Sequence, residues 1–179
     1  MVKLHDLEFE PYLDQKTIAS SVKTVAERIY ADYHTKTPVF LGILNGSFMF
    51  LSDLMKYYEG DCEISFTKLS SYEGTSSTKN INTLLGAGKL EGKDVIVVED
   101  IVDTGHTLEH IIEVLKSENV ASYSIASLFF KPEAYQKSLP IDYIGLEIPN
   151  RFIVGYGLDY NGLGRNLSEI YQLKSSLND

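Results

Sequence analysis

The feature that most constrains this chain of 179 residues is a run of four β-branched residues, Val95–Val98, that leads directly into two acids. Such a short apolar run is typical of a strand buried on both faces of a parallel sheet. Glu99 and Asp100 follow the run, and the segment 103–107 separates them from a stretch whose apolar spacing predicts a helix. Ligands of open α/β sheets bind at the carboxyl ends of the strands. We therefore expect the two acids to lie at the mouth of a binding crevice.

The segment 103–107, with the sequence DTGHT, has the composition of an anion-binding loop. It precedes a predicted helix start, where unpaired backbone N–H groups and the helix dipole favour negative charge. Gly105 allows the backbone to approach a ligand closely, and Thr104 and Thr107 add hydroxyl donors. Two acids beside such a loop suit the vicinal hydroxyls of a sugar, directly or through Mg²⁺. The pattern indicates a sugar phosphate site; the alternative is ordinary turn acids, with Asp103 as a helix cap.

The other apolar patterns predict helices that alternate with strands. A spacing of three to four residues predicts a helix from Asp14 to about Tyr33, with Asp14 as its N-cap. A second helix is expected to be capped by Ser47 and to turn Phe48 inward, together with Leu51, Leu54 and Met55. Strands are expected at 39–44, 62–67, 95–98, 124–130, 142–146 and 152–155. This alternation is typical of an α/β fold with a largely parallel sheet flanked by helices.

Composition and charge narrow the class of protein. The 16 basic and 25 acidic residues give a net charge of -9, which disfavours nucleic acid or an anionic membrane as the main partner. No run approaches the roughly 20 apolar residues of a membrane span, and the first residues carry acids where a signal peptide needs an apolar region. A single cysteine, Cys62, excludes an internal disulfide. We expect a cytoplasmic protein with one domain over residues 1–179.

Five motifs in order resemble the hypoxanthine-guanine branch of the type I phosphoribosyltransferases. The string VVEDIVDTGHT, at 97–107, is similar to the signature of the whole superfamily. The other four resemble the pyrophosphate loop, the mobile lid, the base-reading lysine, and the base-stacking and metal segment of the branch: LNGSF at 44–48, SYEGT at 71–75, Lys131-Pro132, and 152–161 with Arg165. The resemblance covers about residues 8–173. It implies the type I phosphoribosyltransferase fold, with a small hood from the N-terminal segment and about residues 140–179.

The resemblance implies an enzyme of purine salvage. The reaction would transfer the phosphoribosyl group from phosphoribosyl pyrophosphate to N9 of hypoxanthine, and of guanine, and release pyrophosphate. Asp103 would handle the N7 proton as general acid and base. Ser71 and Tyr72 would close over the reacting carbon, which has a chemical reason because bulk water would hydrolyse a ribosyl cation.

Binding roles for phosphoribosyl pyrophosphate follow from the same resemblance. Glu99 and Asp100 would hold the ribose hydroxyls, and Asp159 would join them in serving Mg²⁺. The 5′-phosphate would lie against Thr104, Gly105, His106 and Thr107. The pyrophosphate would contact Arg165 and the loop residues Leu44, Asn45 and Gly46, with an unusual peptide bond between the first two of these.

The base would be read by three residues of the chain. Lys131 would donate to the exocyclic oxygen at C6, Phe152 would stack on the ring, and the carbonyl of Ile153 would meet the 2-position. A lysine that hydrogen-bonds an oxo group rejects adenine, because its donor would face an amino group unpaired. Taken singly, Lys131 could be a solvated lysine after a strand, and Phe152 could be plain core.

Two departures and two alternatives accompany this interpretation. Asn45 and His106 stand where many members of the family have lysine, and histidine is mostly neutral at pH 7. One alternative is an RNA-binding regulator on the same fold, which the acidic charge and the lack of basic clusters disfavour. The other is a phosphoribosyltransferase for xanthine or a pyrimidine. The resemblance also implies a homodimer or homotetramer.

Overall fold

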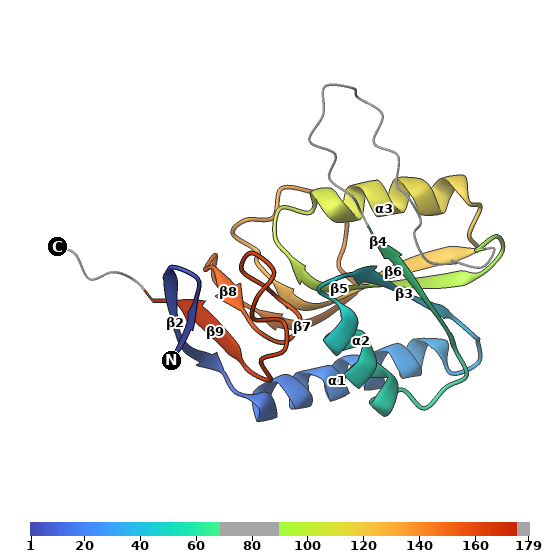
Figure 1. The fold of residues 1–179 in the computed structure, drawn as a ribbon. Coiled ribbons are helices and arrows are strands. Elements are labelled where there is room, and N and C mark those ends of the chain that lie inside the picture. The colour runs from blue at the N-terminus through green and yellow to red at the C-terminus, as the bar shows by residue number, and fades with distance from the viewer. Residues whose placement is uncertain (69–89, 175–179) are drawn as a thin grey trace, which may run out of the picture.

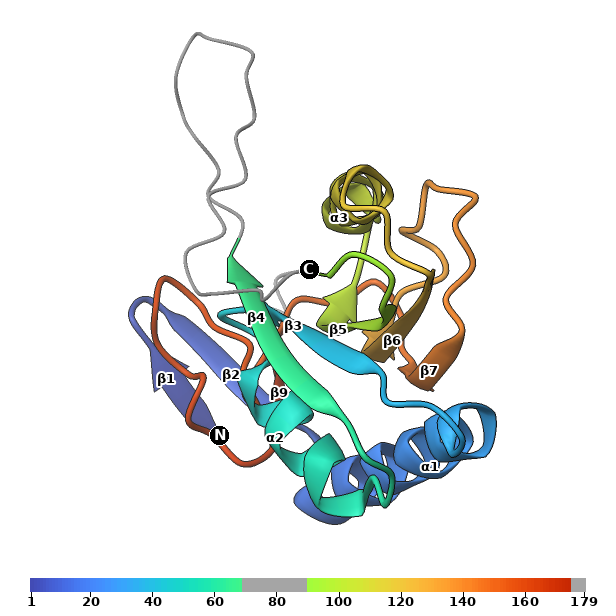
Figure 2. The same ribbon diagram turned by 90° about the vertical axis from the view of Figure 1, so that its right-hand side faces the viewer.

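A five-stranded parallel sheet forms the centre of the molecule in the computed structural model, which describes residues 1–68 and 90–174 (Figure 1). The strand order is β4-β3-β5-β6-β7, and every neighbouring pair is parallel. The strands are β3 Val39–Leu44, β4 Glu63–Lys68, β5 Asp94–Val102, β6 Ser122–Phe130 and β7 Tyr143–Glu147. Helices α1 Gln15–Tyr33 and α2 Phe48–Tyr57 cover one face, and α3 His106–Ser117 covers the other (Figure 2). The expected α/β architecture is thus confirmed.

A second, antiparallel sheet joins the two ends of the chain. Its order is β1-β2-β9-β8, with β1 Val2–Leu4, β2 Leu7–Leu13, β9 Ile170–Leu173 and β8 Ile153–Val154. β9 lies between β2 and β8, so that Leu173 pairs with Phe9 and Gln172 pairs with Ile153. This sheet corresponds to the expected hood. β7, which lies within the range 140–179 expected for the hood, belongs instead to the parallel sheet.

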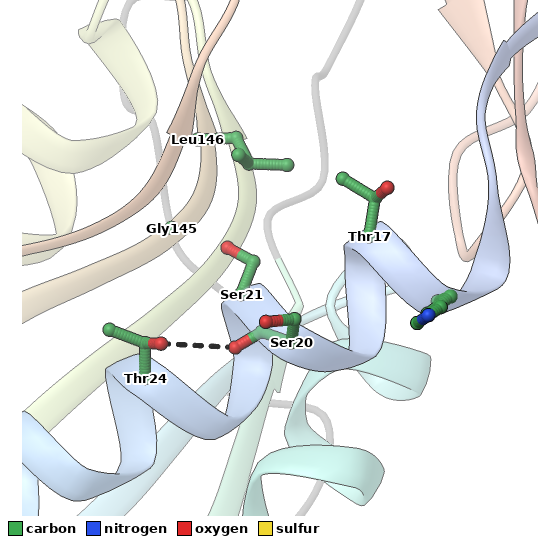
Figure 3. A pocket seen from close by; sticks show the side chains of 7 residues that line it. Thr17, Ser20, Ser21, Thr24, Gly145 and Leu146 are labelled. Carbon is green, nitrogen blue, oxygen red and sulfur yellow. Dashed lines mark hydrogen bonds between the residues drawn. The ribbon is translucent and has the colours of Figure 1, made fainter.

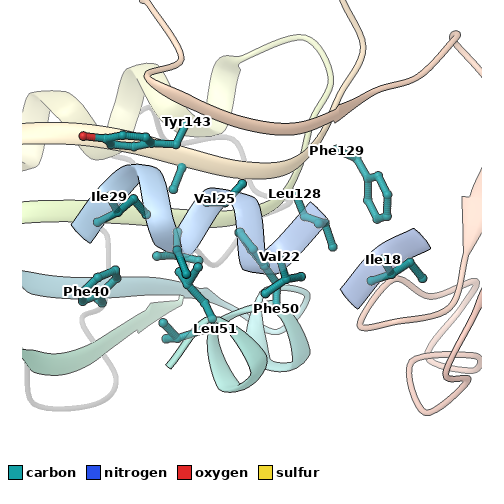
Figure 4. Close-up of a cluster of buried hydrophobic side chains, with 14 of the residues drawn as sticks. Ile18, Val22, Val25, Ile29, Phe40, Phe50, Leu51, Leu128, Phe129 and Tyr143 are labelled. Carbon is teal, nitrogen blue, oxygen red and sulfur yellow. The ribbon is translucent and has the colours of Figure 1, made fainter. Parts of the chain in front are cut away.

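The four β-branched residues that open β5 are buried because the central strand faces a helix layer on each side. Val95 and Val97 belong to the cluster under α3, with Leu108, Ile111, Ile112 and Leu115. Ile96 and Val98 belong to the cluster under α1 and α2, because side chains alternate along a strand. In that cluster, Val22, Val25 and Ile29 of α1 pack against the sheet (Figure 4). Full burial of each such side chain contributes about 1.5–3 kcal/mol.

The starts of α1 and α2 show whether the two residues predicted to cap these helices do so. Asp14 caps α1, since its Oδ1 accepts the N–H of Thr17 at 2.7 Å. Ser47 stands at the N-cap position of α2, but its hydroxyl donates to the carbonyl of Ile43 at 2.7 Å, so the predicted side-chain cap was wrong. No helix in the described ranges is long and apolar enough to cross a membrane.

The predicted inward face of α2 was wrong at Phe48. This side chain is 42% exposed, whereas Phe50, Leu51 and Leu54 are buried. At about 100° per residue, these three positions form one side of the helix and Phe48 falls outside it. The aromatic residue that packs on the sheet is therefore the one two positions later.

Candidate active site

The carboxyl ends of three neighbouring strands bring the predicted site residues to one edge of the sheet. β3, β5 and β6 lie side by side, and they end at Leu44, Val102 and Phe130. Glu99 and Asp100 lie inside β5 rather than after it, because the ladder with β6 continues to the pair Val102 and Phe130. The motifs at 44–46, 99–107 and 131 therefore meet at the edge where ligands of parallel sheets bind.

The two acids of β5 are buried side chains in an electrostatically unfavourable place. Each is only 8% exposed. Burial, and then the charge of Asp100, raise the pKa of Glu99 well above its usual value. Burial raises the pKa of Asp100 to about 6, against the backbone N–H of Ile101 and the charge of Arg165, which lower it. Among the described residues, Oε2 of Glu99 has no hydrogen-bond partner, which is uncommon for a buried carboxyl oxygen.

Asp100 packs against the turn that follows β3. A Cβ on Gly46 would overlap the carboxylate of Asp100, so this position requires glycine. A Cβ on Gly157, whose φ is +99°, would likewise overlap the carbonyl of Gly46. The peptide bond between Leu44 and Asn45 is cis, as the resemblance implied. The turn, the acid and the segment after β8 are therefore in direct contact.

The segment 103–107, predicted to bind an anion, lies at the N-terminus of α3. The helix begins at His106, and its N-cap is Gly105, with φ of +85° and no side-chain cap. Asp103 is therefore not the helix cap. The N–H of Glu109 donates to the Gly105 carbonyl at 3.1 Å, so the helix N–H groups before it have no partner within the helix. Nδ1 of His106 lies 2.9 Å from Oγ1 of Thr104, which brings the ring against this loop.

Asp103 and Lys131 form an ion pair at the ends of β5 and β6. Nζ of Lys131 lies 2.8 Å from Oδ2 of Asp103. The side chain of Lys131 is only 7% exposed, whereas that of Asp103 is 45% exposed. Lys131 is therefore a buried, paired lysine and not a solvated one. The pair offers one donor and one acceptor side by side.

Phe152 is an exposed aromatic ring rather than part of the core. It is 45% exposed and is held from the side by Phe9 and Tyr160, whose ring centroids lie 6.0 and 5.9 Å away. Tyr160 meets it edge to face, and its hydroxyl donates to Asp6 at 2.9 Å. The next residue, Ile153, is buried and pairs with β9. The ring is thus partly exposed while two aromatic neighbours hold it in place.

Arg165 and Asp159 form a second ion pair on the segment after β8. Nη2 of Arg165 lies 2.5 Å from Oδ1 of Asp159, and Nη1 donates to the carbonyl of Gly157 at 2.6 Å. Oδ2 of Asp159 accepts the N–H of Gly162. The charge of Arg165 lowers the pKa of Asp100 and the charge of Asp159 raises it, so both side chains interact electrostatically with this acid of β5. Ser71 and Tyr72 lie outside the described residues.

A separate cavity of about 460 Å³ lies between α1 and β7 (Figure 3). Its lining is mostly small and polar, with Lys16, Thr17, Ser20, Ser21, Thr24, Gly145 and Leu146. None of the predicted site residues lines it. Among the described residues, the predicted site residues therefore lie apart from the lining of this cavity.

Sequence reasoning missed the residues that join the two sheets at the site. Gly157 contacts the turn after β3, and the hydroxyl of Tyr156 donates to Asp53 of α2 at 2.5 Å. The only hint was the string GYG at 155–157, because paired glycines indicate unusual backbone conformations. Tyr156 itself has a positive φ, which no local pattern predicted.

The site belongs to a chain with clear relatives. A model of the phosphoribosyl transferase domain matches residues 9–161. A hypoxanthine-guanine phosphoribosyltransferase of Staphylococcus aureus is 40% identical over 173 residues, which cover 96% of this chain and 97% of that relative. One from Streptococcus pyogenes serotype M3 is 39% identical over 165 residues, with 91% and 92% covered.

Solved structures agree with these relatives. The crystal structure of a hypoxanthine phosphoribosyltransferase from Staphylococcus aureus matches with a TM-score of 0.86 and 38% identity, over 99% of this chain and 100% of that one. A hypoxanthine-guanine phosphoribosyltransferase from Bacillus anthracis matches with a TM-score of 0.86 and 31% identity, over 94% and 100%. The fold expected from the five motifs is confirmed. The chain is an enzyme of the phosphoribosyltransferase family and belongs to its hypoxanthine-guanine branch.

Proposed function

We propose that this enzyme transfers the phosphoribosyl group of phosphoribosyl pyrophosphate to N9 of hypoxanthine, and of guanine, giving the nucleotide and pyrophosphate. The observation that carries the proposal is the ion pair between the buried Lys131 and the partly exposed Asp103, at the sheet edge that also holds two buried acids. A 6-oxopurine with a proton on N7 offers an acceptor and a donor side by side, which matches a lysine beside a carboxylate. Adenine would leave the ammonium group unpaired.

The base would lie on Phe152, whose exposed face is fixed by its aromatic neighbours. Lys131 would donate to the oxygen at C6, and Asp103 would accept the N7 proton as the N9 bond forms. The carbonyl of Ile153 would meet the 2-position. Lys131 and Asp103 already lie side by side. The base would therefore take over part of the hydrogen bonding that each residue now gives the other.

The sugar phosphate would lie across β5 and the start of α3. Glu99, with an unpartnered oxygen, and Asp100 would accept the ribose hydroxyls. The 5′-phosphate would be held by N–H groups and hydroxyls of Thr104, Gly105, His106 and Thr107. Ser71 and Tyr72 would close over the reacting carbon.

The pyrophosphate would contact Arg165 and the turn of Leu44, Asn45 and Gly46. Carboxylate oxygens are the ligands that Mg²⁺ prefers, and Glu99, Asp100 and Asp159 supply them. No group of three or more metal-ligating side chains comes together within residues 1–68 and 90–174, so phosphate oxygens and water would complete the coordination. When bound, Mg²⁺ would neutralise charge on the departing pyrophosphate.

The proposal includes a setting and an assembly. We place the enzyme in the cytoplasm, in keeping with a chain that has one cysteine, Cys62, and so no internal disulfide. We also propose a homodimer or homotetramer, which light scattering would report as a particle of two or four chains of 20.1 kDa.

The test is an initial-rate comparison with hypoxanthine, guanine, xanthine, adenine and uracil, each with and without Mg²⁺. Turnover of hypoxanthine and guanine that requires Mg²⁺ supports the proposal. A preference for xanthine would shift the specificity, and no turnover of any base would reject the activity.

Two substitutions test the assignment of the ion pair. Asp103→Asn is expected to lower kcat far more than it changes the KM for phosphoribosyl pyrophosphate, since it removes the proton acceptor and the charge that faces Lys131 but no proposed contact with phosphoribosyl pyrophosphate. Lys131→Ala is expected to raise the KM for hypoxanthine by roughly tenfold or more. Equal kcat in the first variant, or an unchanged KM in the second, would remove that residue from its role.

A further inference from the structure

The two halves of the proposed pyrophosphate subsite come from different sheets. The turn 44–46 joins β3 to α2 and belongs to the parallel sheet. Arg165 and Asp159 follow β8 and belong to the segment 155–165, which continues the antiparallel sheet. The distance between the turn and the Arg165 guanidinium therefore depends on the contacts that this segment makes with the turn and with α2.

One such contact is made by backbone alone. Gly157 packs on the carbonyl of Gly46 so closely that a Cβ would overlap it. The same glycine carries Arg165, because its N–H donates to the Arg165 carbonyl at 3.0 Å and its carbonyl accepts from the guanidinium at 2.6 Å. Van der Waals contact limits how near the segment can come to the turn, but it does little to stop the two from separating.

The residue before this glycine supplies a directional bond. Tyr156 is 3% exposed, and its hydroxyl donates to Oδ2 of Asp53 at 2.5 Å. Asp53 lies on α2, the helix that begins directly after the turn, and its Oδ1 accepts Lys56 at 2.6 Å. Among the side-chain hydrogen bonds of the described residues, this is the one that joins α2 to the segment 155–165. A hydrogen bond to a carboxylate is about twice as strong as one between neutral groups.

We propose that Tyr156, through Asp53, is a positioning residue that holds Arg165 in register with the turn 44–46. This inference rests on the proposed function, since it assigns a role within the pyrophosphate subsite. Tyr156 would touch no substrate. The base half of the site has its own support, because β8 pairs with β9 and Phe152 packs on Phe9 and Tyr160. Loss of the bond should therefore affect pyrophosphate and phosphoribosyl pyrophosphate more than the purine.

The test compares Tyr156→Phe, Asp53→Leu and Asp53→Asn. The first two remove the donor and the acceptor, whereas asparagine keeps an oxygen that can accept the bond. We expect Tyr156→Phe and Asp53→Leu to raise the KM for phosphoribosyl pyrophosphate roughly tenfold. The KM for hypoxanthine should change less than about threefold, and Asp53→Asn should restore most of the affinity.

The matched control is Tyr171→Phe, which removes a tyrosine hydroxyl that donates to Glu169, only two residues away, at 3.1 Å. This variant should keep both KM values. Melting temperatures are recorded for all variants. A parallel rise of both KM values with a lower melting temperature would assign Tyr156 a merely structural role and overturn the inference, as would an unchanged KM for phosphoribosyl pyrophosphate.

Failure of the proposed function has a different signature. If the wild-type chain turns over no purine, calorimetric binding of pyrophosphate with Mg²⁺ still compares the variants. Weaker binding by Tyr156→Phe and Asp53→Leu alone would then support the link, and equal binding by all of them would reject it.

Discussion

Glu99 and Asp100 are held where the folded protein disfavours their charge. Burial raises the pKa of both, and Glu99 has an oxygen without a partner. Such groups lower the stability of a protein at neutral pH. Active sites often contain them nevertheless, because binding and catalysis need groups with shifted pKa values. In our proposal, ribose hydroxyls and Mg²⁺ supply the missing partners when substrate binds.

Asp100→Asn should stabilise the protein while it destroys activity. The folded-state pKa of about 6 lies above the unfolded value of about 3.9, so the folded state binds more protons between these values. Stability of the wild type should therefore rise as the pH falls through about 6 toward about 4. The variant should be more stable by on the order of 2 kcal/mol above about pH 7, and this gain should shrink as the pH falls toward about 4.

Urea unfolding at several pH values measures this difference. The control is Glu91→Gln, a change of the same kind at an exposed position, which should leave the pH dependence unaltered. If Asp100→Asn is no more stable than the wild type at neutral pH, burial of the charged carboxyl does not lower the free energy of unfolding.

His106 tests how the 5′-phosphate is held. The ring lies against Thr104 at the first residue of α3. His106→Lys would add a full positive charge beside the phosphate, and we expect the KM for phosphoribosyl pyrophosphate to fall about threefold near pH 8. His110→Lys, one turn further along the helix, is the control. Equal KM values in both variants would mean that backbone N–H groups hold the phosphate without help from this side chain.

At the scale of elements, local sequence patterns predicted the helices and strands that pack along their whole length against a neighbouring layer. The apolar spacing of α1 and α3 and the β-branched run of β5 were sufficient, because each meets a whole face of the central sheet. The strands β1, β2 and β9 were not predicted. β1 and β9 are short, and the pairing of Phe9 in β2 with Leu173 in β9 joins residues far apart in the sequence. Pairing at such distance leaves no local periodicity to detect.

In the candidate site, too, some features follow from local sequence and others depend on contacts between residues far apart in the chain. The position of Glu99 and Asp100 near a strand end follows from the sequence, since it depends only on one strand and the helix after it. The bond between Tyr156 and Asp53 joins residues 103 positions apart, and the ion pair of Asp103 and Lys131 needs the order of β5 and β6. Contacts of this kind depend on topology, and composition does not reveal them.

A core substitution in α1 should separate stability from catalysis. Ile29 is fully buried against the sheet, and Ile29→Ala should cost about 2–4 kcal/mol of unfolding free energy by leaving a cavity. Lys23→Ala, on the exposed side of the same helix, should change it by less than about 0.5 kcal/mol. Urea unfolding measures both values. KM values should stay near wild type in both variants, and a selective rise for one substrate in Ile29→Ala would mean that α1 shapes the site directly.

For the whole molecule, the net charge of -9 predicts that the protein does not bind RNA, in contrast to the alternative of an RNA-binding regulator. Proteins that bind RNA through its phosphates need a basic surface. Fluorescence anisotropy with a labelled single-stranded RNA should show no binding up to about 10 μM protein at about 0.1 M salt. Saturable binding below that concentration would revive the regulator, whatever the result with purines. The anionic substrate would be met locally, by α3, Lys131, Arg165 and Mg²⁺.

The place of β9 has a consequence for biosynthesis. Ile170–Leu173 lies between β2 and β8, and it is the strand that connects the beginning of the chain to the segment with Phe152. A ribosome makes β9 after the other strands that the structure describes, so β1 and β2 can pair with it only once all strands of the parallel sheet have been made. A nascent chain stalled before Ile170 would therefore carry the segment 103–107 and the whole parallel sheet, but Phe152 would lack the strand that joins its surroundings to Phe9.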